Sequence, residues 1–474
     1  MTRAPMRTVY RNSVAALCAI AAFAHSGVAQ RIAIRNVTVV DVAAGRHLRN
    51  QAVVIDGDSI SAVVPDRSLN VSGVTRTVDG SGKYLMPGMW DMHIHLISGG
   101  RPSLALLVAN GVVGVRDMGG ALEQVRAWRD SIASGTLLGP RIEMVGPIVE
   151  NAQWLTRVMQ MMAQQGNQEV SRALAERISV ATPEDARAAV ERVAALGMTM
   201  LKVRNDPPAP AYFALLREAR QRGIRVVGHP PVRGPSLADA SDSGMASIEH
   251  LIPSYRQGTW SSALDVMTPE ERAALAATWV RNRTAFDPTI IAGIGFRNMP
   301  DSVVLAIIDD TSGMRDRRMR YVSRALAREW RSQMEMKKVE GPQPDWATLN
   351  RQAAANLRTL DSAGVIILTG SDLGAPLVYP GFAIHDELGL LVREGGMSPA
   401  RALRAATLGA AQFFKEESKT GTVARGMRAD LVLLSADPLA DIANVGRIDS
   451  VILRGRLLDR AALDRILSDV ASQR

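Results

Sequence analysis

The sequence predicts an α/β fold, a (β/α)8 TIM barrel with a small composite β-sandwich domain formed by both chain ends. The chain has 474 residues, 47% of them hydrophobic, which is enough to bury a large core. Short β-type segments lie near both ends. Between them, eight short apolar runs alternate with amphipathic helical stretches over roughly 330 residues, the pattern of a (β/α)8 barrel.

The N-terminal sequence has the pattern of a targeting segment. Arg3, Arg7 and Arg11 precede an apolar stretch at 14–24, and small residues follow up to Ala29. This order predicts a signal peptide covering residues 1–29, so the protein is expected to be exported and periplasmic or secreted. The apolar stretch is shorter than the ~20 residues that a membrane span needs, so no stable membrane anchor is expected.

The composition of the chain limits which modifications and binding partners are expected. Cys18 is the only cysteine and follows Leu17, a poor residue before a lipidated cysteine, so the mature chain should have neither disulfide nor lipid. Removing three arginines from the formal charge of +9 leaves 9 − 3 = +6. This charge indicates a solvated basic surface or attraction of anionic substrates. No nucleic-acid motif occurs and aromatics are only 4% of residues, so nucleic acid is not expected.

The two ends predict one β-sandwich domain. Its first part, residues 30–84, contains β-type runs at 37–42, 52–55 and 59–64. Its second part, residues 419–474, has similar runs at 430–434 and 450–454 and ends in a helix.

The barrel is expected over residues 85–418, with helices such as 183–196 and 212–222 between its strands. Long intervals at 147–182 and 291–363 follow strands, so they should rise over the functional face as lids or substrate walls. The part at 305–338 is equally a candidate contact in a homo-oligomer. The predicted strands are 86–96, 111–116, 141–145, 198–203, 224–229, 247–250, 284–288 and 365–372.

Histidines lie at or near the ends of three of these predicted strands. His93 and His95 are two apart, so they face the same side of one strand and can bind one ion. His229 and His250 end two further strands. A core histidine bonded to backbone is the usual alternative for either one, but three strands ending in histidine favour a metal site.

Two other strands end in reactive groups. Lys202 should point into the barrel, where burial favours a neutral amine that can take up carbon dioxide as a carbamate. The alternative is a lysine that reaches a carboxylate at the rim. Asp372 can bind a metal and accept a proton from a metal-bound water, whose pKa zinc lowers to ~7. Considered without the other candidate ligands, an aspartate at this position is typical of a helix N-cap.

Together these motifs resemble the amidohydrolase superfamily, specifically its prolidase-like and imidazolonepropionase-related branch with a binuclear, carboxylated-lysine site. The resemblance covers nearly all of the mature chain. The motifs are MPGMWDMHIHL (86–96), GVVGVRDMGG (111–120), GPRIEMVGP (139–147), MLKV (200–203), VVGHP (226–230), SIEHL (247–251), LTGSD (368–372), HDELGLLV (385–392), RALRAATLGAA (401–411) and GMRADLVLL (426–434).

The resemblance implies two divalent metal ions, with zinc expected, and carbon dioxide held as a carbamate on Lys202. His93, His95 and Asp372 would bind the more buried ion. His229 and His250 would bind the second, and carboxylated Lys202 would bridge both. A metal-bridging hydroxide would attack a carbonyl, and catalytic Asp372 would carry its proton to the leaving nitrogen.

The implied function is hydrolysis of an amide or peptide C–N bond in a small-molecule or dipeptide substrate, as by a dipeptidase, carboxypeptidase or N-acyl amino acid hydrolase, Xaa-Pro included. Hydrolysis of a cyclic amide, lactone or phosphotriester is one alternative, and a non-catalytic binding or scaffold protein is another. Arg204 and Tyr255 follow ligand-bearing strands and are expected to bind a substrate carboxylate or carbonyl. Asp117 and His385 are expected to be structural.

Overall fold

The computed structural model describes residues 31–164, 168–232, 234–251, 253–256, 259–264, 266–297, 299–339 and 345–473. The predicted signal peptide, with Cys18, lies outside these ranges, so export stays a prediction. None of the described helices is long and apolar enough to cross a membrane.

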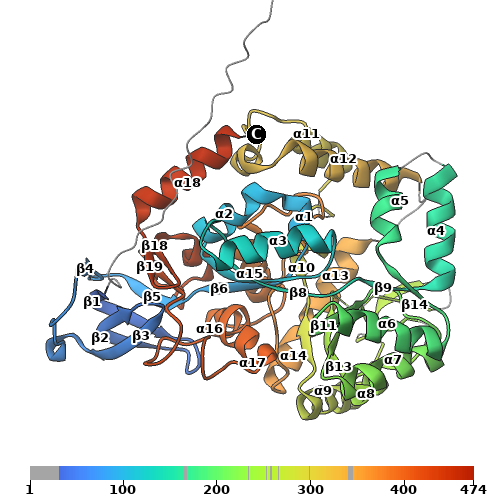
Figure 1. The fold of residues 1–474 in the computed structure, drawn as a ribbon, viewed down its shortest axis with the longest axis horizontal. Coiled ribbons are helices and arrows are strands. Elements are labelled where there is room, and N and C mark those ends of the chain that lie inside the picture. The colour runs from blue at the N-terminus through green and yellow to red at the C-terminus, as the bar shows by residue number, and fades with distance from the viewer. Residues whose placement is uncertain are drawn as a thin grey trace, which may run out of the picture.

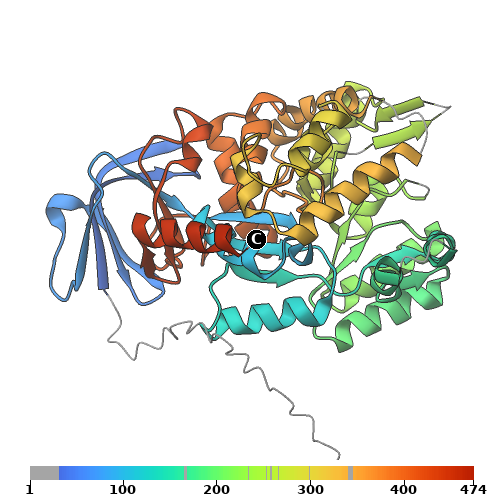
Figure 2. The same ribbon diagram turned by 90° about the horizontal axis from the view of Figure 1, so that it is seen from above.

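Strands from both chain ends pair in one sheet, at the blue end of the molecule in Figure 2. Its members are β1 (Arg31–Asp41), β2 (Arg46–Asp56), β3 (Ser59–Pro65), β4 (Arg76–Asp79), β5 (Tyr84–Pro87), β17 (Leu431–Leu434), β18 (Ile448–Leu453) and β19 (Arg456–Leu458). The order is β19-β18-β17-β5-β1-β2-β3, and β4 also pairs with β1. The junction between the chain ends is the antiparallel pair β5–β17.

A separate small core lies on this sheet. Ile32 and Ile34 lie two residues apart on β1, so they face the same side of the strand, and they pack in one cluster with Leu431 and Leu433 of β17. All eight strands belong to a single hydrogen-bonded sheet, whereas the sequence suggested a two-sheet sandwich. The two ends therefore share one core, and the boundaries of a separate domain stay a prediction.

The centre of the chain forms parallel strands, which confirms the α/β class. One sheet has the order β6-β7-β8 and the other β10-β9-β11-β12-β13-β16. The helices wrap around these strands (Figure 1). The strands are β6 (Met89–Ile94), β7 (Val112–Asp117), β8 (Arg141–Met144), β9 (Val149–Asn151), β10 (Ile178–Val180), β11 (Met200–Val203), β12 (Arg225–Gly228), β13 (Met245–Glu249) and β16 (Ala285–Asp287).

Backbone hydrogen bonds connect the two parallel sheets at both edges. On one side, the Gly146 amide donates to the Met200 carbonyl over 3.0 Å. On the other side, the segment 365–373 lies between β16 and β6. The Leu368 amide donates to Phe286 over 2.8 Å, and the Met92 amide donates to Thr369 over 2.8 Å.

The predicted strand 86–96 is wrong in one respect, because it is two strands in two different sheets. β5 belongs to the sheet of the chain ends and β6 to the parallel strands. The chain crosses between them at Gly88, where a Cβ atom would lie 2.3 Å from a methyl carbon of Val113. Only glycine fits so close a crossing.

The predicted strand 365–372 is also incomplete. It makes isolated bridges only, from Ile367 to Phe286 and from Leu373 to Ile94. The backbone of Asp372 adopts a φ of 52°, a left-handed conformation that interrupts a ladder. The segment therefore occupies the place of a strand without forming a regular one.

Helices follow the strands, and the two predicted ones are confirmed as α6 and α7. Thr182 and Asp185 form a reciprocal capping box at the start of α6, and Pro183 takes its first position. α18 packs against α2, which attaches the C-terminus to the central part. The helices are α1 (Leu96–Gly99), α2 (Arg101–Ala109), α3 (Leu122–Ala133), α6 (Pro183–Ala195), α7 (Ala209–Gln221), α8 (Leu237–Ser243), α9 (Pro269–Asn282), α15 (Ala383–Arg393), α16 (Pro399–Arg404), α17 (Ala410–Phe414) and α18 (Arg460–Ser472).

The long intervals are mostly helical. The interval 147–182 contains β9, β10 and two helices, and a short hairpin, β14 (Pro253–Arg256) with β15 (Thr259–Ser262), follows β13. Figure 1 shows α4 and α5 side by side at one end of the molecule and α11 with α12 along another edge. The helices of both intervals are α4 (Ala152–Gln164), α5 (Gln168–Ala175), α10 (Ile290–Ile294), α11 (Asp301–Ile308), α12 (Arg324–Val339), α13 (Trp346–Ala355) and α14 (Leu357–Ser362).

Candidate metal centre

Six side chains predicted as metal ligands lie at or next to the carboxyl ends of parallel strands. Because these strands run in the same direction, their ends gather on one side of the molecule. The six occupy β6 and the residue after it, β11, the residues after β12 and β13, and the segment 365–373; they are His93, His95, Lys202, His229, His250 and Asp372.

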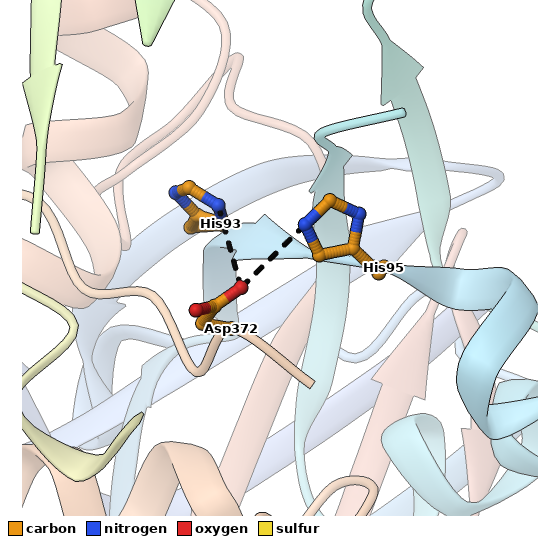
Figure 3. Close-up of side chains that lie close together, drawn as sticks. All are labelled: His93, His95 and Asp372. Carbon is orange, nitrogen blue, oxygen red and sulfur yellow. Dashed lines mark ion pairs between the residues drawn. The ribbon is translucent and has the colours of Figure 1, made fainter. Parts of the chain in front are cut away.

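His93, His95 and Asp372 form the tightest group (Figure 3). Asp372 Oδ1 lies 3.6 Å from His93 Nε2 and 3.5 Å from His95 Nε2. Two ligand atoms bound at ~2.0–2.1 Å to one tetrahedral zinc ion are about 3.3 Å apart. The three donor atoms therefore have the spacing of ligands that share one ion.

The other three residues adjoin this group. Lys202 Nζ lies 3.3 Å from His93 Nε2, and His250 Nε2 lies 3.2 Å from His229 Nε2. The His250 ring stands 4.6 Å from that of His93, and its Nδ1 lies 3.9 Å from Asp372 Oδ2. The structure thus brings all six predicted residues into one connected cluster.

Two of the six residues have unusual backbone conformations. His250 and Asp372 have φ values of 70° and 52°, which non-glycine residues rarely adopt and which often occur at functional sites. Each is held by an amide hydrogen bond of 2.7 Å, from His250 to the Asp287 carbonyl and from Asp372 to the His93 carbonyl. These bonds turn both side chains toward the centre.

His229 depends on the glycine before it. Gly228 has a φ of 138°, and a Cβ atom there would lie 2.0 Å from the Val203 carbonyl oxygen. The close approach lets the His229 amide donate to that carbonyl over 3.0 Å. The motif VVGH therefore needs its glycine so that the imidazole can leave the strand beside Lys202.

Three imidazoles are oriented through Nδ1. His95 donates to the Gly119 carbonyl over 2.7 Å. His93 Nδ1 lies 2.8 Å from Glu249 Oε2, and His250 Nδ1 lies 2.7 Å from the Thr289 hydroxyl. With Nδ1 occupied, Nε2 is left to bind a metal, as metal-ligating histidines commonly require.

Burial keeps the imidazoles neutral. It lowers the pKa of His93 and of His229 well below the usual histidine range. Burial, with the charge of Lys202 as the next cause, lowers the pKa of His95 to about 4 and that of His250 to about 3. Neutral imidazole is the form that binds metals, so all four can serve as ligands at neutral pH.

Lys202 is also perturbed. Burial lowers its pKa to about 8, although the charges of Asp372 and Glu249 act in the opposite direction. Only 2% of the residue is exposed. A substantial fraction of the side chain is therefore a neutral amine near physiological pH.

Sequence reasoning missed a buried polar layer behind the cluster. Asp91 accepts hydrogen bonds from the Ser371 amide (2.9 Å) and hydroxyl (2.6 Å), which fixes the residue before Asp372. Arg116 Nη2 donates to both carboxylate oxygens of Glu249, over 2.9 and 2.8 Å. The available signal was a charged residue inside each apolar run, in MWDMH, VVGVRD and SIEH.

The predicted substrate residues lie beyond the cluster. Arg204 follows β11, and its guanidinium lies 5.1 Å from the Trp154 ring centre and 3.5 Å from Glu150. Arg177 pairs with the same Glu150, which was not predicted. The side chain of Tyr255, on β14, lies outside the described residues.

Asp117 and His385 have structural contacts, as expected. Asp117 accepts hydrogen bonds from the Leu96 amide (2.9 Å) and the Gly119 amide (3.2 Å), which supports the loop that holds His95. His385 donates to the Asn110 carbonyl over 2.8 Å.

Known proteins share the whole architecture. A Bifidobacterium longum protein assigned as a prolidase is 25% identical, with a TM-score of 0.66 over 94% of this chain and 100% of its own. A Xaa-Pro dipeptidase with bound methionine is 22% identical, with a TM-score of 0.64 over 91% of this chain and 100% of its own. Aspergillus niger ochratoxinase is 19% identical, with a TM-score of 0.63 over 91% and 96%.

Similarity at the level of sequence is more local. An adenine deaminase from Rubrobacter xylanophilus is 34% identical over 79 residues, which are 17% of this chain and 13% of the deaminase. Ochratoxinase is 35% identical over 101 residues, 20% of each protein. This chain therefore matches a fifth or less of each of these curated relatives. The sequence model of the amidohydrolase family, in contrast, matches residues 84–458. Because that match covers most of the sequence and contains the whole cluster, the chain belongs to the amidohydrolase family.

Proposed function

We propose that this protein is a metal-dependent hydrolase that cleaves the C–N bond of dipeptides or N-acyl amino acids, Xaa-Pro included. One observation carries the proposal. Four imidazoles, one lysine and one carboxylate form a single cluster, with neighbouring donor atoms 3.2 to 3.9 Å apart. The likeness to a Xaa-Pro dipeptidase over 91% of the chain favours linear peptide substrates over other amides.

The cluster would sit at the mouth of a closed (β/α)8 barrel. The hydrogen bond from Gly146 to Met200 and those of the segment 365–373 support closure, because they supply both links between the two parallel sheets. In such a barrel the carboxyl ends of the strands form the catalytic face. The sheet of the chain ends would form the smaller domain beside it.

The donor set fits two divalent cations. His93, His95 and Asp372 would hold the more buried ion, and His229 with His250 would hold the second. When bound, such ions polarise a carbonyl and make water acidic enough to attack it near neutral pH. Nitrogen and carboxylate ligands at this spacing favour zinc.

Lys202 would link the two halves of the site after reacting with carbon dioxide. The lone pair of its neutral amine forms a bond to the carbon, and one N–H proton leaves to solvent. The product is an anionic carbamate with two oxygens in place of a cation. The depressed pKa of Lys202, about 8, supports this step because it leaves the amine unprotonated part of the time.

Asp372 would move the proton. Its side chain is 26% exposed, whereas the neighbouring His93 side chain is fully buried, so the carboxylate can reach both the cluster and a substrate. It accepts a proton from the attacking water and returns it to the leaving nitrogen. Among the six residues of the cluster, it is the one carboxylate.

Arg204 would bind the free carboxylate of the substrate's leaving amino acid. Burial is the main cause of the lowered pKa of His229 and His250, and the charge of Arg204 adds to it, which supports a place for Arg204 near the second half of the site. Glu150 and Trp154 hold the guanidinium, whose side chain is still 38% exposed. Arginine suits this task because it binds carboxylates in a bidentate manner.

A charge count supports an anionic ligand at this rim. Two guanidinium groups, of Arg177 and Arg204, share the single carboxylate of Glu150. Asn205 occupies the other oxygen of that carboxylate over 2.5 Å. This group of described residues therefore has one more guanidinium than carboxylate, which favours an anionic substrate group.

The test is a substrate panel on the zinc-loaded protein, with metal content measured in parallel. We expect about two ions per chain and release of free amino acids from dipeptides and N-acyl amino acids. Dipeptides amidated at the C-terminus should react more slowly than their free acids. Turnover of lactones or phosphotriesters without any turnover of peptides would contradict the proposal, as would a metal-replete protein that binds no metal.

A further inference from the structure

A buried carboxylate stands directly behind His93. Glu249 Oε2 lies 2.8 Å from His93 Nδ1, and both side chains are fully buried. The other oxygen, Oε1, accepts hydrogen bonds from the Ser247 hydroxyl and from Arg116. Glu249 therefore touches the imidazole on the side away from Lys202 and Asp372.

Arg116 supplies the opposite charge. It reaches Glu249 from another strand, since Arg116 lies on β7 and Glu249 on β13. Its Nη1 donates to the Ser247 hydroxyl over 2.9 Å, and its Nε donates to the Met92 carbonyl. The Phe413 ring lies 4.8 Å from the guanidinium carbon. These contacts fix the position of the Arg116 side chain.

Fold stability alone does not require such a pair. Replacing a buried ion pair by apolar residues of similar volume is often neutral or stabilising, because removing two charges from water is costly. A second buried acid adds to the energetic cost of this arrangement. Asp287 Oδ2 lies 3.6 Å from the same guanidinium. Neither side-chain oxygen of Asp287 has a hydrogen-bond partner among the described residues. A purely structural core has no reason to keep two acids around one arginine.

We infer that the Arg116–Glu249 pair is a positioning device for His93. The carboxylate fixes the proton of that imidazole on Nδ1, so the lone pair of Nε2 faces Lys202 Nζ at 3.3 Å and Asp372 Oδ1 at 3.6 Å. Arg116 holds the carboxylate in line with Nδ1 through two hydrogen bonds. Neither residue touches substrate. The inference rests on the proposed function, because it concerns the more buried half of the metal site.

Metal titration of the apoprotein tests the inference without any substrate. Glu249→Gln keeps the shape of the side chain but can turn its amide N–H₂ toward Nδ1. We expect it to weaken binding of the first ion about 10- to 100-fold, the usual effect of losing such a partner. Asp287→Asn is the matched control. It alters an acid beside the same arginine whose side chain bonds no imidazole among the described residues, so metal affinity should stay within about twofold.

A double variant separates positioning from structural support. Made in the Asp287→Asn background, so that no buried acid is left without its arginine, Arg116→Met with Glu249→Leu removes the pair together, and the melting temperature should stay near that of the Asp287→Asn protein. Metal affinity should nevertheless remain as low as in Glu249→Gln. Selective ¹⁵N NMR of the histidines in the apoprotein gives an independent signature: the Nδ1–H form of His93 in the wild type, and its loss in the double variant.

Two outcomes would overturn the inference. One is a Glu249→Gln protein that binds both ions as tightly as the wild type. The other is a double variant that recovers wild-type affinity, which would make the pair a support of the fold only. Failure of the proposed function looks different, because the wild-type protein itself would then bind no metal.

Discussion

The centre of the site and its rim are built on different principles. Five of the six side chains in the cluster lie at or next to the ends of regular parallel strands, and Asp372 lies in the irregular segment beside them. The rim consists of the insertion with α4 and α5, and the hairpin β14–β15, both of which extend beyond the strands (Figure 2). The cluster is therefore built on the strands of the fold, whereas we expect the added segments to shape the choice of substrate.

Substitution of Lys202 in the cluster should have the largest effect on activity. Lys202→Ala removes the amine that would carry the carbamate, so activity should fall to background and metal content should drop below two ions per chain. Short carboxylic acids such as acetate should restore part of the activity, because they can occupy the vacated position. Atomic absorption and turnover measured with and without acetate check both effects. Full activity of the variant would remove Lys202 from the site.

Asp372→Asn should have the next largest effect. The amide keeps a donor oxygen near His93 and His95 but cannot take up a proton. We expect kcat to fall about 10²- to 10⁴-fold, the usual contribution of a general acid–base group. Metal analysis should show that most of the metal remains. A fall that is explained entirely by metal loss would argue that Asp372 is a ligand only.

Arg204→Met tests the rim. It should lower kcat/KM for free dipeptides by about 10- to 100-fold, which corresponds to the loss of one hydrogen-bonded charge pair. It should have little effect on the same peptides with an amidated C-terminus. Arg187→Met is a suitable control, because among the described residues Arg187 pairs with exposed Glu184 of its own helix, α6. Equal losses on both substrate forms would contradict carboxylate binding.

The pH dependence of activation should be smaller but diagnostic. Only the neutral amine of Lys202 reacts with carbon dioxide, and burial lowers its pKa to about 8. The neutral fraction rises with pH, so at a fixed concentration of dissolved carbon dioxide the rate at which apoprotein regains activity with zinc should increase about tenfold per unit below pH 8 and level off above it. Activity regained after timed mixing between pH 6 and 9 measures this rate. A flat profile would argue against carbamate formation.

The same contrast explains what could be predicted from the sequence. His93, His95, Lys202, His229 and His250 were identifiable because each ends an apolar run, and parallel strands bring such ends together. The α/β class followed from the same alternation. The strand expected at 365–372 proved irregular because Asp372 turns its backbone into the left-handed region, which no periodicity reveals.

Partners separated by long stretches of sequence could not be predicted. Glu249 and Arg116 are 133 residues apart, and their pairing depends on the packing of two strands across the interior. Glu150 lies in an insertion, so its contact with Arg204 follows from no local pattern. The six residues predicted from the sequence lie together in the structure, whereas the groups that hold them were not predicted.

The pairing of β5 with β17 has a consequence for biosynthesis. β5 ends at Pro87 and β17 begins at Leu431, so 431 − 87 = 344 residue positions separate one edge from its partner. At translation rates of about 5–20 residues per second, that edge emerges roughly 17–70 s before the strand that covers it. An uncovered strand edge invites pairing with other chains. The nascent protein therefore passes through an interval in which its first sheet needs protection by a chaperone or by delayed folding.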